Sequence, residues 1–358
     1  MNYKTSLVNF EVFFVPKEQR VSVIMKDIAR AVDQGCDTIV GLMLADGFLF
    51  FDNDTAKLLI TVEQEGRKLG IKNFILIPGI VPNLDVPGYE VIKTFNFNLH
   101  LAYLSYKDKR HLLQPWNQNA DKFLFLGGVP NRPNRINLLE KFYKAGLLEH
   151  AVWSFFKPWT DEQADWCRKA LPDYTDDEYN NFLNACENSI DDMYINSKEY
   201  GTHTDFDFNG STWFKDPAWI DPQVYANTLL SVVSEGQSAE ESRSSFLTEK
   251  TWRVFAQRHP FILAGDYTMM KYVTSLGFKT FNKSCELDDV VSATRQFLEL
   301  REDVTDAVEH NYNLFFKLGN SNSAVLDELK TKFNIEQADI DKWFNQTGFA
   351  HLIRNNHV

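Results

Sequence analysis

Strand-like and helix-like patterns of hydrophobic residues alternate over the first hundred residues of the chain. Apolar runs of strand length occupy residues 9–15, 38–44, 73–78 and 89–97. Between them, residues 21–33 and 56–69 carry apolar side chains at helical spacing, and Gly35 and Gly70 follow these helices where C-caps are expected. This alternation predicts a Rossmann-like α/β domain with a parallel sheet.

The same alternation returns after a polar connector at residues 110–121, which contains Pro115. We expect strands at residues 122–126, 229–233 and 261–264 and helices at residues 136–145, 269–276, 290–300 and 304–318. A further helix is expected to begin after Thr248 and to end at His259-Pro260, because the residue before a proline disfavours helix. The chain after residue 320 is expected to be helical, with Trp343 and Phe344 docking it.

These patterns predict two Rossmann-like domains in a chain of 358 residues. The first covers residues 1–115, the second covers residues 122–318, and residues 319–358 form a C-terminal helical segment. Within the second domain, residues 161–192 contain ten acidic residues against Arg168 and Lys169. We therefore expect an acidic, solvated helical insertion at about residues 156–220.

The composition is that of a globular protein, with 44% hydrophobic and 24% charged residues. The N-terminal residues lack the pattern of a signal peptide, and no apolar run reaches the roughly 18 residues of a membrane span. We therefore expect a cytoplasmic protein with no membrane partner. The four cysteines are scattered without a CxxC pair, which favours free thiols over a disulfide framework or a zinc site.

The net charge of −12 is unevenly distributed along the chain. Residues 1–120 are balanced, and the rest of the chain carries the whole negative charge. An acidic balance argues against a broad nucleic-acid footprint, although a local basic groove remains compatible with it. The neutral N-terminal part is the half expected to bind an acceptor.

The stretch from Ser244 to Phe281 carries the clearest candidate chemistry. Thr248 is a good N-cap, and Glu249 and Lys250 fall in the first turn of the helix that follows. A helix N-terminus with a lysine favours phosphate, and a carboxylate beside it suits the two hydroxyls of a ribose. The spacing thus fits a nucleotide diphosphate, while an ordinary exposed Glu and Lys at a helix start is the structural alternative.

The run FLTEKTWRVFAQRHPFILAG, followed by LGFKTF, resembles the donor-binding segment of GT-B glycosyltransferases, particularly the fucosyltransferase-like group and its phage relatives. The resemblance covers roughly residues 122–282 and is sharpest at residues 123–154 and 246–265. It implies two Rossmann-like domains facing a cleft, with the C-terminal helices packing across them. It also implies that Glu249 holds the ribose and Lys250 the diphosphate of a nucleotide sugar.

Other donor-site candidates surround this segment in the expected fold. Arg135, and after it Arg132, lie in the loop after the first strand of the second domain and match the basic residue of the resembling proteins; two solvated loop arginines are the alternative. Thr248, as the N-cap, belongs to the same donor site. Ser234 and Glu235 follow the strand at residues 229–233, at the edge where such sheets bind ligands.

Asp46 follows the strand at residues 38–44 and is the candidate general base, with a simple turn cap as the alternative. Asp52 and Asp54 are weaker candidates, since Asp54 or Thr55 fits the cap of the next helix. The DNDT segment lacks the other positions of a calcium loop. His203, Asp205 and Asp207 alternate as a metal cluster on a strand would, but a polar loop is favoured, so no metal is expected.

These features lead us to expect an inverting, metal-independent glycosyltransferase that uses a nucleotide sugar as substrate and needs no cofactor. The favoured acceptor is a hydroxymethylated base, of the 5-hydroxymethylcytosine type, in bacteriophage DNA, which would place a phage-encoded protein in the host cytoplasm. Transfer to a glycan or a small molecule is the alternative that the acidic charge favours. A third hypothesis is a non-catalytic protein that binds a nucleotide sugar. The absence of a GxGxxG fingerprint counts against a nicotinamide dehydrogenase.

Overall fold

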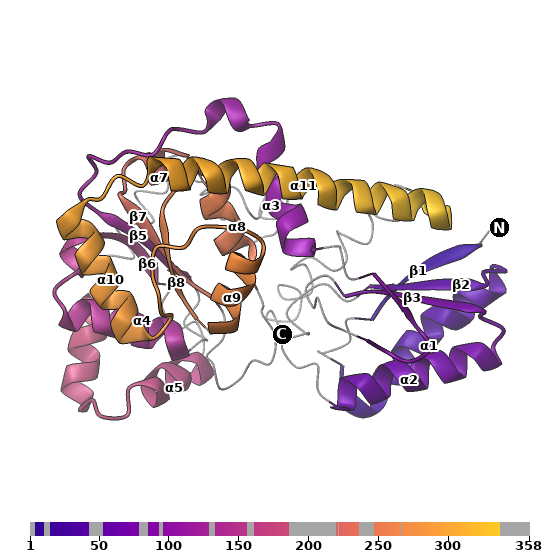
Figure 1. Cartoon of the computed structure of the whole chain (residues 1–358). Helices are drawn as coiled ribbons and strands as arrows, with labels where there is room; N and C mark the ends of the chain where they lie inside the picture. The colour runs from indigo at the N-terminus through magenta and orange to yellow at the C-terminus, as the bar shows by residue number, and fades with distance from the viewer. Residues whose placement is uncertain are drawn as a thin grey trace. The chain divides into compact units, whose positions relative to one another are not determined.

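The computed structural model describes residues 4–10, 15–42, 53–78, 85–92, 96–128, 133–155, 161–185, 220, 222–235, 247–265 and 267–336. By contacts between residues, the chain divides into two compact units. The first unit comprises residues 1–100, 243–246 and 318–358, and the second comprises residues 101–242 and 247–317. Each contains a four-stranded parallel sheet, as expected for two Rossmann-like α/β folds (Figure 1).

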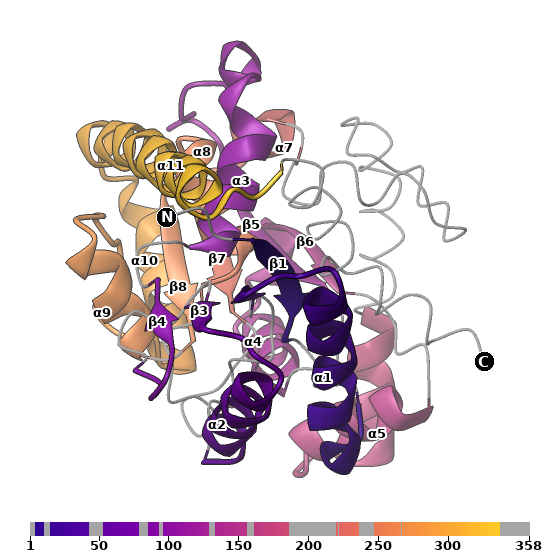
Figure 2. The same cartoon turned by 90° about the vertical axis from the view of Figure 1, so that its right-hand side faces the viewer.

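The sheet of the first unit has the strand order β1-β2-β3-β4. Its strands are β1 (Thr5–Asn9), β2 (Thr38–Leu42), β3 (Asn73–Ile77) and β4 (Glu90–Val91), and its two crossover helices are α1 (Lys17–Asp33) and α2 (Asn53–Lys68). Every crossover moves in the same direction along the sheet. Because parallel crossovers are right-handed, α1 and α2 therefore lie on the same face (Figure 2).

Alternate strand residues face these two helices and form the core of the first unit. Val8, Ile39 and Phe74 pack with Ile24 of α1 and Leu59 of α2, and all five are buried. The periodicities of two and 3.6 residues that predicted the strands and helices are the cause of this packing.

Gly41 is required in the middle of this sheet. A Cβ atom at Gly41 would overlap the ring of Phe10, so only glycine lets that ring lie over β2. The aromatic side chain thus closes the end of the core that is built by α1 and α2.

The opposite face of the first sheet meets the second half of helix α11 (Thr305–Phe333). Leu7, Leu42 and Ile77 line a small apolar pocket together with Leu326 and Leu329. This half of α11 is also held by polar contacts. Asn322 accepts a hydrogen bond from the backbone N–H of Asn96 at 2.7 Å and donates one to its carbonyl at 2.8 Å, and Lys332 pairs with Glu90 at 2.7 Å.

The sheet of the second unit has the order β6-β5-β7-β8, and all of its neighbours are parallel. The strands are β5 (Phe123–Gly128), β6 (Ala151–Phe155), β7 (Leu230–Ser234) and β8 (Phe261–Ala264). The chain first adds β6 on one side of β5 and then returns to add β7 on the other. This reversal creates a topological switch point between β5 and β7, where ligands of such sheets bind.

Helices cover both faces of the second sheet. On one face, Phe123 and Phe125 pack with buried residues of α4 (Pro133–Lys144), α5 (Asp161–Ala170) and α10 (Leu287–Leu300). On the other face, Leu124 and Leu126 line a pocket with residues of α7 (Pro222–Ala226) and α8 (Glu249–Ala256). Further helices described in this unit include α9 (Tyr267–Ser275), most of α3 (Phe97–Lys107) and the first half of α11. Short 3-10 turns occupy Arg110–Leu112 and Leu148–His150.

The edge strand β8 is closed by a side chain. Asn282 accepts a hydrogen bond from the backbone N–H of Leu263 at 3.1 Å and donates one to the carbonyl of Leu263 at 3.0 Å. The amide therefore completes the hydrogen bonds that a further strand would have made.

The acidic segment folds as expected in part. Residues 161–170 and 176–185 are helical, but Cys167 and Phe182 are fully buried and belong to the core of the unit. A purely solvated insertion is therefore wrong for residues 161–185, because one face of each helix is apolar. Residues 156–160 and 186–219 lie outside the described part of the chain.

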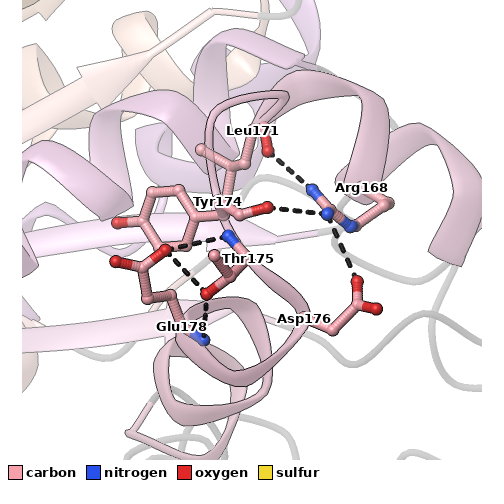
Figure 3. Close-up of polar contacts among 6 residues, drawn as sticks. All are labelled: Arg168, Leu171, Tyr174, Thr175, Asp176 and Glu178. Atoms are coloured by element: carbon pink, nitrogen blue, oxygen red, sulfur yellow. Dashed lines mark hydrogen bonds and ion pairs between the residues drawn. The ribbon is translucent and has the colours of Figure 1, made fainter.

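The turn between these two helices is built from side-chain caps (Figure 3). Arg168 donates to the carbonyls of Leu171 at 2.8 Å and Tyr174 at 2.7 Å, which ends α5. Thr175 and Glu178 form a capping box at the start of the second helix, where the Glu178 carboxylate accepts from the Thr175 N–H at 2.8 Å.

Four predicted elements need correction. The first strand begins earlier than expected, at Thr5 rather than Asn9, and residues 11–14 lie outside the described part. A strand over residues 89–97 is wrong, since β4 covers only Glu90–Val91 and Phe97 starts α3. Helix α8 ends at Ala256, because Arg258 adopts a left-handed conformation (φ 51°) before Pro260 is reached. The expected break near residue 318 does not exist, because α11 runs unbroken from Thr305 to Phe333.

No helix in the part of the chain that the structure describes is long and apolar enough to span a membrane. Trp343 and Phe344 fall outside that part.

Candidate functional site

Glu235 occupies the switch point of the second sheet, directly after β7. Its side chain is fully buried, and its carboxylate accepts hydrogen bonds from the Thr248 N–H at 3.0 Å, the Thr248 hydroxyl at 2.7 Å and the Thr251 hydroxyl. Its main-chain carbonyl accepts a hydrogen bond from the side-chain amide of Asn134 at 2.7 Å. Glu235 therefore ties the start of α4 and the start of α8 to the end of β7.

The N-terminus of α8 follows the sequence prediction. Thr248 is its N-cap, with extended backbone angles and a hydroxyl that accepts from the N–H of Lys250 at 3.3 Å. Glu249 and Lys250 lie in the first turn, and their side chains form an ion pair at 2.9 Å. Both side chains are mostly buried but keep some exposure, at 17% for Glu249 and 23% for Lys250. They are thus held in place and still reachable from solvent.

The two carboxylates of this site differ in their electrostatics. Burial raises the pKa of Glu235, and Lys250 with the two threonine hydroxyls limits that rise. Burial also acts to raise the pKa of Glu249, but the positive charges of Lys250 and Arg253 outweigh it, so the pKa lies below the usual value. Glu249 is therefore kept as a carboxylate, which is the form that accepts hydrogen bonds from a diol.

Arg253 is a further charged residue of the site and is not among the residues predicted from the sequence. It lies on α8 one turn after Lys250 and is only 8% exposed. Both side chains line a small pocket between the sheet and α8. The pocket lining is Leu124, Leu126, Tyr225, Ser231, Val232, Val233, Ser234, Lys250, Arg253 and Val254. A buried guanidinium thus borders a small pocket of mixed lining at the switch point.

Two buried tyrosines, Tyr225 and Tyr106, lie beside the Arg253 side chain. Tyr225 of α7 is hydrogen-bonded to the Arg253 side chain, and Tyr106 of α3 lies close enough to influence its charge. Tyr106 in turn accepts a hydrogen bond from Gln257 at 3.1 Å, and burial raises the pKa of both tyrosines. Although burial acts to lower the pKa of Arg253, these tyrosines with Glu249 and Glu235 raise it, so the guanidinium stays charged.

A buried histidine supports the same pocket. His259, before β8, has its Nδ1 atom 2.8 Å from the hydroxyl of Ser231 and its Nε2 atom 2.8 Å from the carbonyl of Thr228. A carbonyl can only accept, so Nε2 carries the proton and Nδ1 accepts from Ser231. Burial lowers the pKa of His259 to about 4, which makes it a neutral structural group.

The structure places the remaining sequence-predicted residues as follows. Arg135 lies in the first turn of α4 rather than in the preceding loop, and it is buried next to Asn134. Ser234 ends β7 with a buried hydroxyl that has no hydrogen-bond partner among the residues described. Asp46, Asp52, Arg132, His203, Asp205 and Asp207 lie outside the described residues, as does the side chain of Asp54.

The structure thus brings together Thr248, Glu249, Lys250 and Glu235, and joins them to the helix that carries Arg135. Within the described ranges, no group of three or more His, Cys, Asp and Glu side chains is arranged to hold a metal ion. Comparison with protein families, with curated proteins and with solved structures finds no match for the chain. The function is therefore argued from the site itself.

Proposed function

We propose that this protein is a glycosyltransferase that moves a sugar from a nucleotide-sugar donor to an acceptor hydroxyl. One observation carries the proposal: Glu249 and Lys250 share the first turn of α8 at the switch point of a parallel sheet. That place binds nucleotides in other α/β proteins, and a helix N-terminus with a lysine suits their phosphates.

In this proposal, the residues of the second unit bind the donor. Lys250 and the start of α8 stabilise the negative charge that develops on the departing nucleotide diphosphate. Glu249 accepts hydrogen bonds from the ribose hydroxyls, and Arg135 reaches the diphosphate from α4. Because Lys250 can leave its ion pair with Glu249 for a phosphate, both side chains become available when the donor binds.

We also propose that the two units form a GT-B arrangement around a cleft, and that Asp46 of the first unit acts as the base in an inverting reaction. No metal is needed, since lysine, arginine and the helix dipole supply the positive charge. The acceptor proposed is a hydroxymethylated base in DNA.

Thermal unfolding in the presence of nucleotides tests the donor site. Nucleoside diphosphates and their sugars are expected to raise the melting temperature of the wild-type protein by mass action. Lys250→Ala is expected to weaken this binding about tenfold or more, because a charge-assisted contact to phosphate is lost. Lys271→Ala, which removes an exposed lysine of α9 in the same unit, should leave the shift unchanged.

The absence of any nucleotide-dependent shift in the wild-type protein would remove the proposal. A shift without sugar transfer to any acceptor would leave a nucleotide-sugar-binding protein. Transfer is measured with a labelled donor, on DNA with and without 5-hydroxymethylcytosine. Labelling of glycans or small molecules but not of modified DNA would reassign the acceptor.

A further inference from the structure

The guanidinium of Arg253 is charged and buried, which is unfavourable unless a partner compensates for the lost hydration. Arginine is almost never buried unless it is paired, because removing its charge from water is costly. Arg253 is 8% exposed, and its Nε atom has no hydrogen-bond partner among the residues that the structure describes. Tyr225 supplies one hydrogen bond, which leaves the Nε–H as a buried donor in need of an acceptor.

The two nearby carboxylates, those of Glu235 and Glu249, bind groups other than Arg253. Glu235 accepts its hydrogen bonds from Thr248 and Thr251, and Glu249 pairs with Lys250. Over the described ranges, Arg253 forms no ion pair with a carboxylate, although Glu249 and Glu235 lie near enough to stabilise its charge. The site therefore holds a charged arginine without giving it an anionic partner of its own.

The position of Arg253 points to the missing partner. Arg253 and Lys250 are three residues apart on α8, so they share one face of the helix. Both line the small pocket between α8 and the sheet. A pocket of this size has room for one small group of a ligand rather than for a sugar or a base.

We propose that Arg253 is a ligand-binding residue that, together with Lys250, takes a phosphate group in this pocket. This inference rests on the proposed function, because the phosphate is that of the nucleotide donor. Arginine offers a planar fork of N–H donors that matches phosphate oxygens, whereas lysine acts as a point charge. Tyr225 keeps the fork in place before the ligand arrives, which lowers the ordering cost of binding.

Calorimetric binding of pyrophosphate and of nucleoside diphosphates tests this role with a matched pair of variants. Arg253→Gln removes the charge but keeps a side chain that can bond to Tyr225. It is expected to weaken both ligands about tenfold. Arg258→Gln removes an arginine that follows the same helix but pairs with Glu309 at 3.0 Å and stacks on Tyr312. That control should bind both ligands like the wild type.

Further variants separate binding from folding. Arg253→Lys keeps a charge in the pocket and should recover only part of the affinity, since the fork is lost. Tyr225→Phe keeps Arg253 but frees its side chain, so a smaller loss is expected. If Arg253→Gln does not fold, Arg253→Lys carries the test, and wild-type affinity in that variant would contradict the proposal.

The two ligands distinguish this inference from the proposed function. Wild-type binding of nucleoside diphosphates that Arg253→Gln leaves unchanged would overturn the role of Arg253 and leave the donor site intact. Binding of pyrophosphate but of no nucleotide, dependent on Arg253, would support the phosphate pocket and remove the glycosyltransferase. Binding of neither ligand by the wild-type protein would overturn both.

Discussion

His259 illustrates how one buried side chain couples the stability of this protein to pH. Its ring bridges Ser231 of β7 and the carbonyl of Thr228, and burial lowers its pKa to about 4. In the unfolded chain a histidine binds its proton near pH 6.5. The folded state therefore resists protonation over a range in which the unfolded state accepts it.

We predict that protonation of His259 adds no pH dependence to the free energy of unfolding above about pH 6.5. Below that pH, the free energy of unfolding falls as the pH drops towards about 4. The loss from this group is about 3 kcal/mol over that window, since each pKa unit corresponds to about 1.4 kcal/mol. Urea unfolding at about pH 7.5 and about pH 5 measures it.

His259→Gln should reduce this pH dependence, while His150→Gln, at a histidine whose side chain is 55% exposed, should preserve it. An equally steep dependence in His259→Gln would show that another group is responsible.

At the scale of elements, prediction from sequence succeeded where the hydrophobic period was uninterrupted. The strand at residues 261–264 and the end of the helix at Asp33 were placed at their observed bounds, and Thr248 was identified as an N-cap. It failed where strand pairing, rather than the local apolar pattern, sets the bounds of an element. The run at residues 9–15 is more apolar than Thr5–Asn9, yet pairing with β2 uses the earlier residues, and strand pairing is not visible in one sequence.

The candidate site was predictable in its local part only. Thr248, Glu249 and Lys250 are consecutive, so a cap and a first turn could be read from the sequence. Arg253 was missed because its significance depends on burial, although a charge between Trp252 and Val254 in an apolar helix was an available signal. The contact between Asn134 and Glu235, which are 101 residues apart, comes from the fold alone.

Asn282 is expected to stabilise β8, because its side-chain amide makes the hydrogen bonds to Leu263 that a further strand would make. Asn282→Ala leaves the N–H and carbonyl of Leu263 without these hydrogen bonds, and we expect the free energy of unfolding to fall by about 2–3 kcal/mol. Urea unfolding gives the loss, and hydrogen exchange at Leu263 locates it. Asn227→Ala, at an exposed asparagine, should change stability by less than about 0.5 kcal/mol. Unchanged exchange at Leu263 would contradict this role.

At the scale of the whole molecule, the two sheets differ in strand order: in the first, each successive strand lies next to the previous one, and in the second, the chain reverses direction after β6. The first unit adds its strands in one direction, so both of its crossover helices cover one face and leave the other to α11. The second unit reverses direction, which separates α4 and α8 onto opposite faces and creates the switch point. Of the two sheets, the second has the topology suited to the donor that we propose.

The packing of α11 predicts which of the two sheets is destabilised by a mutation in that helix. Leu329→Ala removes a side chain that is 5% exposed, and about 2–4 kcal/mol of stability should be lost from the first unit. Hydrogen exchange should therefore accelerate in β1, β2 and β3 more than in β5, β7 and β8. Leu300→Ala, at a leucine that is 56% exposed, is the matched control and should have little effect. Equal acceleration in both sheets would mean that the chain unfolds as one unit.

The position of α11 in the chain has a consequence for biosynthesis. The first sheet is translated early, but Leu326 and Leu329, which line a pocket with Leu7, Leu42 and Ile77, are made only after the whole second unit. During translation, this apolar face must wait uncovered while the ribosome makes the whole second unit. The second unit ends at residue 317, so it can be completed before the second half of α11 emerges. In a nascent chain we therefore expect the second sheet to be completed before the first, and the first sheet to need protection from aggregation until the second half of α11 emerges.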